Sequence, residues 1–300
     1  MAAPSRRRLV MGQGGRAPEE RVSAVIVNYN TSQHLLDCLR SLREDGVADV
    51  VVADNGSRDG SAEAVANADA EVTVVHTGGN LGYGGGANRG SAVARGDLLL
   101  VCNADVRVEP GAVKSLVAAL DADARLAVVG PLIEDPEGSV YPSPREFPSV
   151  ADAVGHGFLG MVAPGNRFSR RYRMLDSDRS SGAEADWVSG SCFLIRRRAW
   201  EALGGFDESY FMFAEDVDLC WRAWKSGWTV AFEPAARVVH VRGASTELAP
   251  YRMILAHHRS LLRFARRTLT GWRRCLLPVV ALGLLARAAL ACAQRASGRG

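Results

Sequence analysis

Short apolar runs alternate with amphipathic segments along the first half of this 300-residue chain. The runs are rich in β-branched residues, a composition that favours strands buried on both faces of a sheet. Between them, apolar residues return at helical spacing, as Leu35, Leu39 and Leu42 do. The pattern predicts strands at 22–28, 49–53, 72–75, 98–102 and 126–129, with helices after Ser32, from near Ser61, before Gly96 and over 111–120. This alternation predicts an α/β fold with a doubly wound, mostly parallel sheet.

Beyond residue 130 the pattern weakens and then returns. Residues 131–185 are rich in Pro, Gly, Ser and charge, which is typical of a long connection. We expect a strand at 186–195, a helix from Glu215 to about Lys225, and strands at 229–232 and 237–241. The predicted organisation is a disordered N-terminal extension at 1–20, one α/β domain at 21–250 and a helical tail at 251–300.

The charge is uneven along the chain, although the net charge is only +3. Residues 251–300 hold ten arginines and no acid, so the rest of the chain is acidic overall. Within this tail the run 275–286 is apolar for twelve residues until Arg287 interrupts it, short of the roughly 20 residues that a spanning helix needs. A basic helix beside an apolar one favours contact with an anionic membrane surface. The alternative is a helical hairpin packed on the domain, or an oligomer contact.

The N-terminal residues carry basic side chains but no apolar stretch of the kind found in signal peptides. We therefore expect a cytoplasmic protein, held at the inner face of the cell membrane through its basic tail. No nucleic-acid partner is expected.

Polar clusters follow three of the predicted strands, at 28–30, 54–57 and 103–105. Doubly wound sheets bind ligands in the crevice beyond the carboxyl ends of their strands, where all three clusters fall. Asp54 is well placed there to accept a hydrogen bond from a pyrimidine ring N–H. The plain alternative is turn chemistry, because Asp-Asn-Gly-Ser is a strong turn sequence.

Asp105 is a candidate ligand for Mg²⁺ or Mn²⁺, since these ions take few protein oxygens together with substrate phosphates. His240 follows a later predicted strand and offers a nitrogen ligand, which suits Mn²⁺ better than Mg²⁺. A strand-ending Asx turn at Asp105 and a structural histidine at 240 are the competing interpretations.

Three acids in four residues, Glu215, Asp216 and Asp218, stand at the start of a predicted helix behind an aromatic stretch. Carboxylates are stabilised at a helix N-terminus, so simple capping accounts for one of them. The excess favours a general base in this group.

The glycine run after the third strand formally matches a dinucleotide fingerprint, with Gly82, Gly84 and Ala87 in the pattern and Asp105 further on. The match is weak, because these glycines do not follow the first strand and the polar strand ends stay unexplained. A nucleotidyltransferase would need a glycine-rich, basic triphosphate loop near the first strand, and VNYNTSQH has none.

Taken together, the motifs resemble glycosyltransferase family 2, in the branch of bacterial rhamnosyltransferases of cell-wall and polysaccharide assembly. The resemblance covers about residues 21–265 and rests on VSAVIVNYNT, VVADNGSRDGS, GGNLGYGGGANRG, LLLVCNADV, DWVSGSCFLIRR, GGFDESYFMFAEDVDLCWR and the downstream His240, in that order. It implies the GT-A fold and transfer of a sugar from a nucleotide-diphosphate sugar to a hydroxyl of a glycan or lipid-linked acceptor, with inversion.

The resemblance also implies roles for individual residues. The nucleotide-sugar pocket takes Tyr29, Asp54, Asn80, Asn88, Asn103 and Asp105; the sugar and acceptor side takes Trp187, Gly190 and Asp207; the catalytic pair is Asp216, the base, with Glu215 in support. Asp105 matches the last acid of the family's D-x-D metal motif, and Asn103 replaces the first, which puts strict metal dependence in question. A non-catalytic nucleotide-sugar-binding protein of the same fold is the competing hypothesis.

Overall fold

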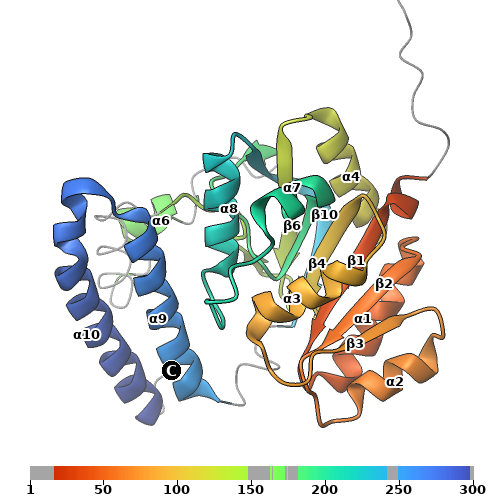
Figure 1. The fold of residues 1–300 in the computed structure, drawn as a ribbon, viewed down its shortest axis with the longest axis horizontal. Coiled ribbons are helices and arrows are strands. Elements are labelled where there is room, and N and C mark those ends of the chain that lie inside the picture. The colour runs from red at the N-terminus through yellow and green to blue at the C-terminus, as the bar shows by residue number, and fades with distance from the viewer. Residues whose placement is uncertain are drawn as a thin grey trace, which may run out of the picture.

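A ten-stranded sheet forms the centre of the protein (Figure 1). The computed structural model describes residues 17–147, 163, 165–172, 174, 182–241 and 249–297. The main order of strands is β3-β2-β1-β4-β9-β6-β10-β5, with β7 paired to β6 and β8 to β10. Their bounds are β1 Val22–Asn28, β2 Asp49–Asp54, β3 Thr73–His76, β4 Leu98–Asn103, β5 Val106–Val108, β6 Leu126–Glu134, β7 Val140–Tyr141, β8 Ala183–Glu184, β9 Cys192–Arg196 and β10 Thr229–His240.

The predicted strands of the first half are confirmed, and they are parallel to one another. β1 lies between β2 and β4, and the register places Asn28 opposite Asp54 and Val27 opposite Asn103. Every residue of β1 is buried, as expected for a central strand covered on both faces. The register brings the three polar strand ends to one edge of the sheet, where the sequence predicts a ligand crevice.

Two expectations for the second half were wrong. The strand predicted at 186–195 begins only at Cys192, because the preceding residues form a loop in which the Trp187 backbone pairs with Arg145. β9 then runs antiparallel between β4 and β6. The two strands predicted at 229–232 and 237–241 are one strand, β10, whose register shifts between Glu233 and Arg237.

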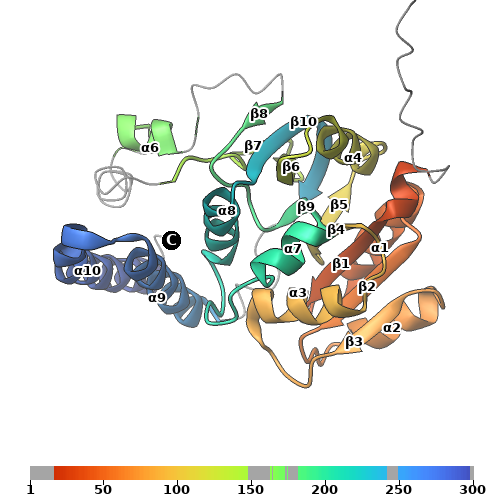
Figure 2. The same ribbon diagram turned by 45° about the horizontal axis from the view of Figure 1, so that its top comes forward.

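Helices cover both faces of the sheet, as in a doubly wound fold (Figure 2). One face packs on α1 (Ser32–Glu44), α2 (Ser61–Ala68) and α4 (Ala112–Ala122), and the other on α3 (Gly82–Val93), α7 (Arg197–Leu203) and α8 (Glu215–Lys225). Fully buried leucines such as Leu35, Leu100 and Leu116 fill the first interface. Each contributes about 1.5–3 kcal/mol by leaving water.

The structure describes the predicted extension and the predicted connection only in part. Residues 1–16 of the predicted extension lie outside the described residues, and the rest leads into a 3₁₀ helix, Pro18–Arg21. The connection 131–185 is only partly described. Its first four residues are the end of β6, and it also holds β7, β8 and the short helix α6 (Arg167–Tyr172).

The C-terminal segment forms a helical hairpin beside α8 (Figures 1 and 2). Its helices are α9 (Pro250–Thr268) and α10 (Leu277–Ala296), joined through the 3₁₀ helix Gly271–Leu276. The helix continues past Arg287, so the apolar segment is longer than the sequence suggested. Among the described residues, Gly271–Ala296 is the one helical segment long and apolar enough to cross a membrane, with a mean hydropathy of 2.2.

Candidate active site

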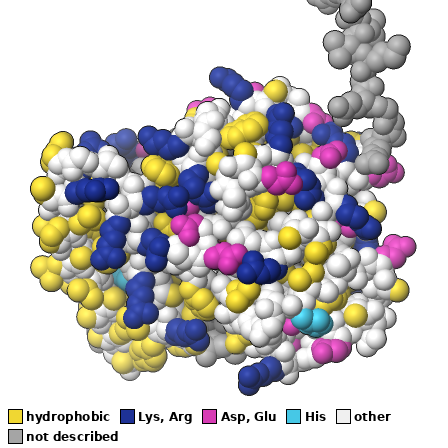
Figure 3. All heavy atoms as spheres, viewed as in Figure 1, with side chains coloured by type: hydrophobic (Ala, Val, Ile, Leu, Met, Phe, Trp, Pro, Cys, Tyr) yellow, Lys and Arg dark blue, Asp and Glu magenta, His cyan; other side chains and the backbone are white. Residues whose placement is uncertain are grey.

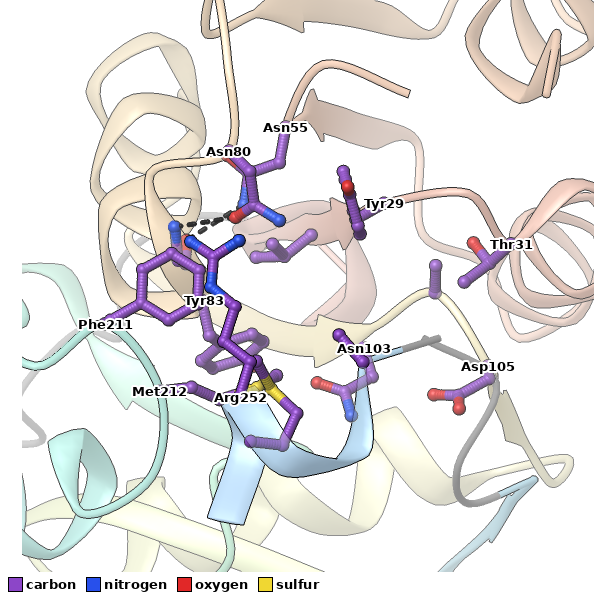
Figure 4. A pocket seen from close by; sticks show the side chains of 15 residues that line it. Tyr29, Thr31, Asn55, Asn80, Tyr83, Asn103, Asp105, Phe211, Met212 and Arg252 are labelled. Atoms are coloured by element: carbon purple, nitrogen blue, oxygen red, sulfur yellow. Dashed lines mark hydrogen bonds between the residues drawn. The ribbon is translucent and has the colours of Figure 1, made fainter. Parts of the chain in front are cut away.

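A pocket of about 180 Å³ opens at the carboxyl ends of β1, β2 and β4 (Figure 4). Segments far apart in sequence line it: strand ends and the glycine run on one side, and the segment before α8 together with α9 on the other. The lining residues are Val27, Tyr29, Thr31, Asn55, Asn80, Gly82, Tyr83, Asn103, Ala104, Asp105, Phe211, Met212, Ala249, Arg252 and Met253.

The glycine run allows a close approach between α3 and the segment before α8. Asn55 Nδ2 donates to the Gly82 carbonyl at 2.9 Å, and Gly82 N donates to Asn80 Oδ1 at 2.9 Å. Gly82 has φ +81°, and a Cβ there would lie 1.9 Å from the Phe211 carbonyl oxygen, so only glycine fits. The run therefore serves packing, and its match to a dinucleotide fingerprint is formal.

Asp54 is buried and is not part of the pocket lining. Its carboxylate accepts hydrogen bonds from Asn28 Nδ2 at 3.0 Å and from the Ser57 N–H at 3.3 Å, and His76 Nδ1 lies 3.5 Å away. Only 4% of the residue is exposed. In this conformation the Asp54 side chain stabilises the turn after β2, which contains the pocket residue Asn55.

Asn103 and Asp105 line the pocket, and His240 lies against both. The structure thus brings together Asp105 and His240, the two residues that the sequence predicts as metal ligands. His240 Nε2 lies 3.1 Å from Asp105 Oδ1 and 3.2 Å from Asn103 Nδ2. One carboxylate and one imidazole converge there, with an amide beside them. Among the described residues no group of three or more His, Cys, Asp or Glu side chains is placed to hold a metal. The donor set therefore fits a divalent ion that takes its remaining ligands from substrate phosphates, not an ion held by protein alone.

Glu215 and Asp216 begin α8, and backbone groups orient Asp216. Its two carboxylate oxygens accept hydrogen bonds from the Gly190 N–H and the Val217 N–H, both at 2.8 Å. A Cβ on Gly190 would lie 3.0 Å from the Asp216 Cβ, which places Gly190 directly against the acid. Tyr83 connects this pair to the pocket, since it lines the pocket and its hydroxyl donates to the Gly190 carbonyl at 2.5 Å.

The two acids have different surroundings. Glu215 is buried, and its Oε2 has no hydrogen-bond partner. Burial, and then the Asp216 charge, raise the pKa of Glu215 well above its usual range. Burial also raises the pKa of Asp216, against the opposing effect of the Gly190 and Val217 N–H groups and the Arg145 charge. Paired carboxyls with raised pKa values beside a pocket are typical of acid–base sites.

The backbone leading to these acids is in an uncommon conformation. Phe213 and Ala214 have φ of +67° and +65°, in the left-handed region that non-glycine residues seldom adopt. Such strain persists only where surrounding contacts impose it, and it concentrates at functional sites.

A family profile described as Glycosyl transferase family 2 matches residues 23–204, and one described as Glycosyl transferase family group 2 matches residues 148–295. The N-acetylglucosaminyl-diphospho-decaprenol L-rhamnosyltransferase of Mycobacterium tuberculosis is 39% identical over 278 residues, which cover 87% of this chain and 89% of the relative. The chain belongs to glycosyltransferase family 2. It is a glycosyltransferase with the GT-A fold, as the sequence motifs imply.

More distant proteins are also similar to this chain, and the solved structures among them are similar in fold. The low-salt glycan biosynthesis hexosyltransferase Agl10 of Haloferax volcanii is 27% identical over 207 residues, 67% of this chain and 61% of the relative. The mannosyltransferase PcManGT of Pyrobaculum calidifontis, solved with GDP-Man and Mn²⁺, has a TM-score of 0.58 at 19% identity and covers 92% of this chain and 75% of its own. GalNAc-T7, solved with UDP, GalNAc and Mn²⁺, has a TM-score of 0.56 at 18% identity and covers 73% of this chain and 43% of its own.

Eight residues predicted for the glycosyltransferase site are not part of the pocket lining. Five of them are described above: Asp54, Gly190, Glu215, Asp216 and His240. The other three make contacts elsewhere. Asn88 holds a turn: its amide donates to the Phe206 carbonyl at 2.9 Å and accepts from the Phe206 N–H at 2.9 Å. Asp207 accepts from Ser209 N and binds Arg267 Nη1 at 2.9 Å. Trp187 is buried, and its indole N–H donates to the Glu146 carbonyl at 3.2 Å.

Other residues of the glycosyltransferase pocket were not predicted, above all those from α9. Arg252 and Met253 enter from this helix, and Phe211 and Met212 from the segment before α8. The aromatic residues ahead of Glu215 were a signal for the second group. Nothing in the local pattern of α9 distinguishes Arg252 from the other arginines of the tail.

Proposed function

We propose that this glycosyltransferase moves a deoxyhexose such as rhamnose from a nucleotide-diphosphate sugar to a hydroxyl of a diphosphate-linked polyprenyl glycan, with inversion. The observation that carries the proposal is the Asp216 carboxylate, oriented by two backbone N–H groups next to a pocket at the strand ends. The mycobacterial relative, whose name specifies rhamnosyl transfer to a diphospho-decaprenol-linked sugar, supports this choice of donor and acceptor.

Asp216 is the general base in this proposal. Its carboxylate takes the proton of the acceptor hydroxyl, whose oxygen attacks the anomeric carbon as the nucleoside diphosphate departs from the opposite face. Partial exposure keeps Asp216 open to an acceptor, while its neighbour Glu215 is buried. Glu215 supports the base. Its raised pKa keeps it protonated and neutral, so the negative charge of the pair lies on Asp216.

Asp105 and His240 would hold a divalent ion, Mg²⁺ or Mn²⁺, together with the donor diphosphate. Bound there, the ion supplies stabilisation of negative charge on the departing diphosphate. Tyr29, Asn55 and Asn80 line the opposite end of the same pocket and would contact the nucleoside.

We further propose that α10 rests on the inner face of the cell membrane. Its apolar side chains Val279, Leu282 and Leu285 are 69%, 70% and 68% exposed and recur at helical spacing on one face. Figure 3 shows hydrophobic side chains along the outer edge of α10 and basic side chains over α9 beside it. An apolar face flanked by arginines suits an anionic lipid surface, where a lipid-linked acceptor would be met.

Transfer of labelled sugar tests the function. Wild-type protein and Asp216→Asn are incubated with membrane lipids and one of four donors: dTDP-rhamnose, UDP-galactose, UDP-glucose or GDP-mannose. We expect label in the lipid fraction with dTDP-rhamnose and wild-type protein, and almost none with Asp216→Asn. Equal label from both proteins would exclude Asp216 as the base. Nucleotide binding without label from any donor would favour the non-catalytic binding protein.

Sedimentation with liposomes tests the membrane contact. The double variant Leu282→Asp/Leu285→Asp places two charges on the exposed face of α10 without touching the core. We expect wild-type protein to pellet with anionic liposomes at low salt and the variant to stay in the supernatant. Val140→Asp, at another exposed apolar position, is the matched control and should pellet like the wild type. Pelleting of the double variant would contradict docking through α10.

A further inference from the structure

The pocket lining contains two charged residues, and they come from opposite sides. Asp105 follows β4, and Arg252 stands in the first turn of α9. Figure 4 shows the Arg252 side chain beside Phe211, with Asp105 across the pocket. A negatively charged group that binds between them meets a guanidinium on one side and the proposed metal position on the other.

Arg252 differs from the other arginines that face the domain from α9. Arg267 pairs with Asp207 at 2.9 Å and with Asp218 at 3.0 Å, and Arg263 lies over the Tyr210 ring. Within the described part of the chain, Arg252 forms no ion pair; its guanidinium lies 5.0 Å from the centre of the Phe211 ring. This contact positions the charge and leaves its N–H donors open to a ligand.

The place of Arg252 is fixed because α9 is attached along the whole segment before α8. Ser260 donates to the Met212 carbonyl at 2.8 Å, and the His257 ring stands edge-on to Phe213 at 5.2 Å. Near the other end of the helix, Arg267 joins Asp207 to the fully buried Asp218. The first turn of α9 is therefore held over the pocket by contacts further along the same helix.

We propose that Arg252 binds the diphosphate of the sugar donor from the side opposite Asp105. This inference rests on the proposed function, since it takes a nucleoside diphosphate as the ligand of the pocket. A guanidinium presents planar N–H donors that match phosphate oxygens in pairs. Arg252 is exposed, so its N–H donors are accessible to a ligand. As the glycosidic bond breaks, its positive charge stabilises the charge that develops on the departing diphosphate. α9 is then part of the donor site and not only a support for the membrane helix.

Calorimetric titration with UDP, dTDP and GDP, each with Mn²⁺, tests the assignment. With the nucleoside diphosphate that binds wild-type protein best, we expect Arg252→Ala to weaken affinity at least about tenfold and Arg252→Lys to weaken it less. Affinity for the matching nucleoside, followed by NMR titration, should stay within about twofold, because the nucleoside carries no phosphate. Arg259→Ala is the matched control: Arg259 is exposed on the same helix outside the pocket lining, so its loss should change neither affinity.

Each other outcome is decisive. Unchanged diphosphate affinity in Arg252→Ala overturns the assignment and leaves the proposed function standing. Equal loss for the diphosphate and the nucleoside also overturns it, since Arg252 would then act through packing on Phe211. If wild-type protein binds none of the three diphosphates, the proposed donor site itself fails, and this inference with it.

Discussion

The two sides of the pocket are built by different means. The sheet side comprises Asn55, Asn80, Asn103 and Asp105. These residues lie at or just after the ends of the neighbouring parallel strands β2, β3 and β4. The helix side comprises Phe211 and Met212 with Arg252 and Met253, from segments about 40 residues apart in the chain. Backbone pairing sets the positions on the sheet side. Side-chain contacts between α9 and the segment before α8 set those on the helix side.

This difference separates two tasks. Backbone register holds the sheet side rigidly, which suits recognition of the nucleotide and a metal ion. The helix side continues through Phe213 and Ala214, which are both in left-handed conformation, into Glu215 and Asp216. We infer that the sheet side binds the nucleoside and the metal ion. The helix side supplies Arg252 to the donor diphosphate and leads to the acids that perform the proton transfer.

Replacing Asp216 by Asn should have the largest effect, on the rate of sugar transfer. We expect transfer to fall about 10²–10⁴-fold, since a positioned general base contributes that much. Nucleoside diphosphate affinity should stay within about twofold, because the sheet side is untouched. Steady-state kinetics and calorimetry measure the two effects. Glu201→Gln, an exposed acid on α7, is the control and should change neither; a parallel loss of donor affinity would show that the two sides are not separate.

Replacing Asp105 by Asn tests the sheet side. We expect the strengthening of nucleoside diphosphate binding by Mn²⁺ to weaken at least about tenfold, as loss of a metal-site contact commonly does. Binding measured without metal should change little, because the charge lost is the one that faces the ion. Titration with and without Mn²⁺ measures the difference. An unaltered response to Mn²⁺ would remove Asp105 from the metal site; Asp123→Asn, away from the pocket, serves as reference.

Replacing Arg267 by Ala tests how the helix side is held together. Asp218 is fully buried and would keep only its contacts with Arg222 at 2.7 Å and Tyr210 at 3.4 Å. We expect the free energy of unfolding to fall by about 1–3 kcal/mol, the usual result when a buried charge loses a partner. Urea denaturation measures it. Arg266→Ala, the exposed neighbour, should cost almost nothing; equal losses in both variants would argue against the link between α9 and α8.

Replacing Glu215 by Gln should give the smallest effect, with a characteristic pH dependence. The raised pKa of Glu215 means that the folded protein holds its proton more tightly than the unfolded chain. That stabilisation is present below the unfolded pKa and is lost as pH rises through the folded pKa. The variant should therefore gain on the order of 1 kcal/mol over wild type near neutral pH and nothing in acid.

The pH profile of transfer gives a second readout on the same variant. Glutamine is neutral, as Glu215 is while it holds its proton, so the pKa of Asp216 and the acid limb of the profile should stay in place. A limb that moves to lower pH in the variant would show that Glu215 carries a negative charge in the wild-type protein.

The sequence by itself determined the parallel strands of the first half and their ligand edge. Apolar runs such as 22–28 and 98–102 gave the strands, and the parallel order placed Asn28, Asp54 and Asn103 at one edge. Glu215 at the start of a helix was also predicted correctly. These features follow from local periodicity and from the short-range chemistry of strand ends and helix caps, which a single segment contains within itself.

Only the tertiary structure decided which polar residues reach the pocket. Asn88 and Asp207 are polar and close in sequence to pocket residues, yet each is used in a tertiary contact elsewhere. Arg252 reaches the pocket because α9 packs along the segment before α8, a contact between residues far apart in the chain. Local patterns record which face of a helix is apolar but not which neighbour that face meets. For this reason the C-terminal tail, which the charge pattern set apart from the domain, contributes Arg252 and Met253 to the pocket of that domain.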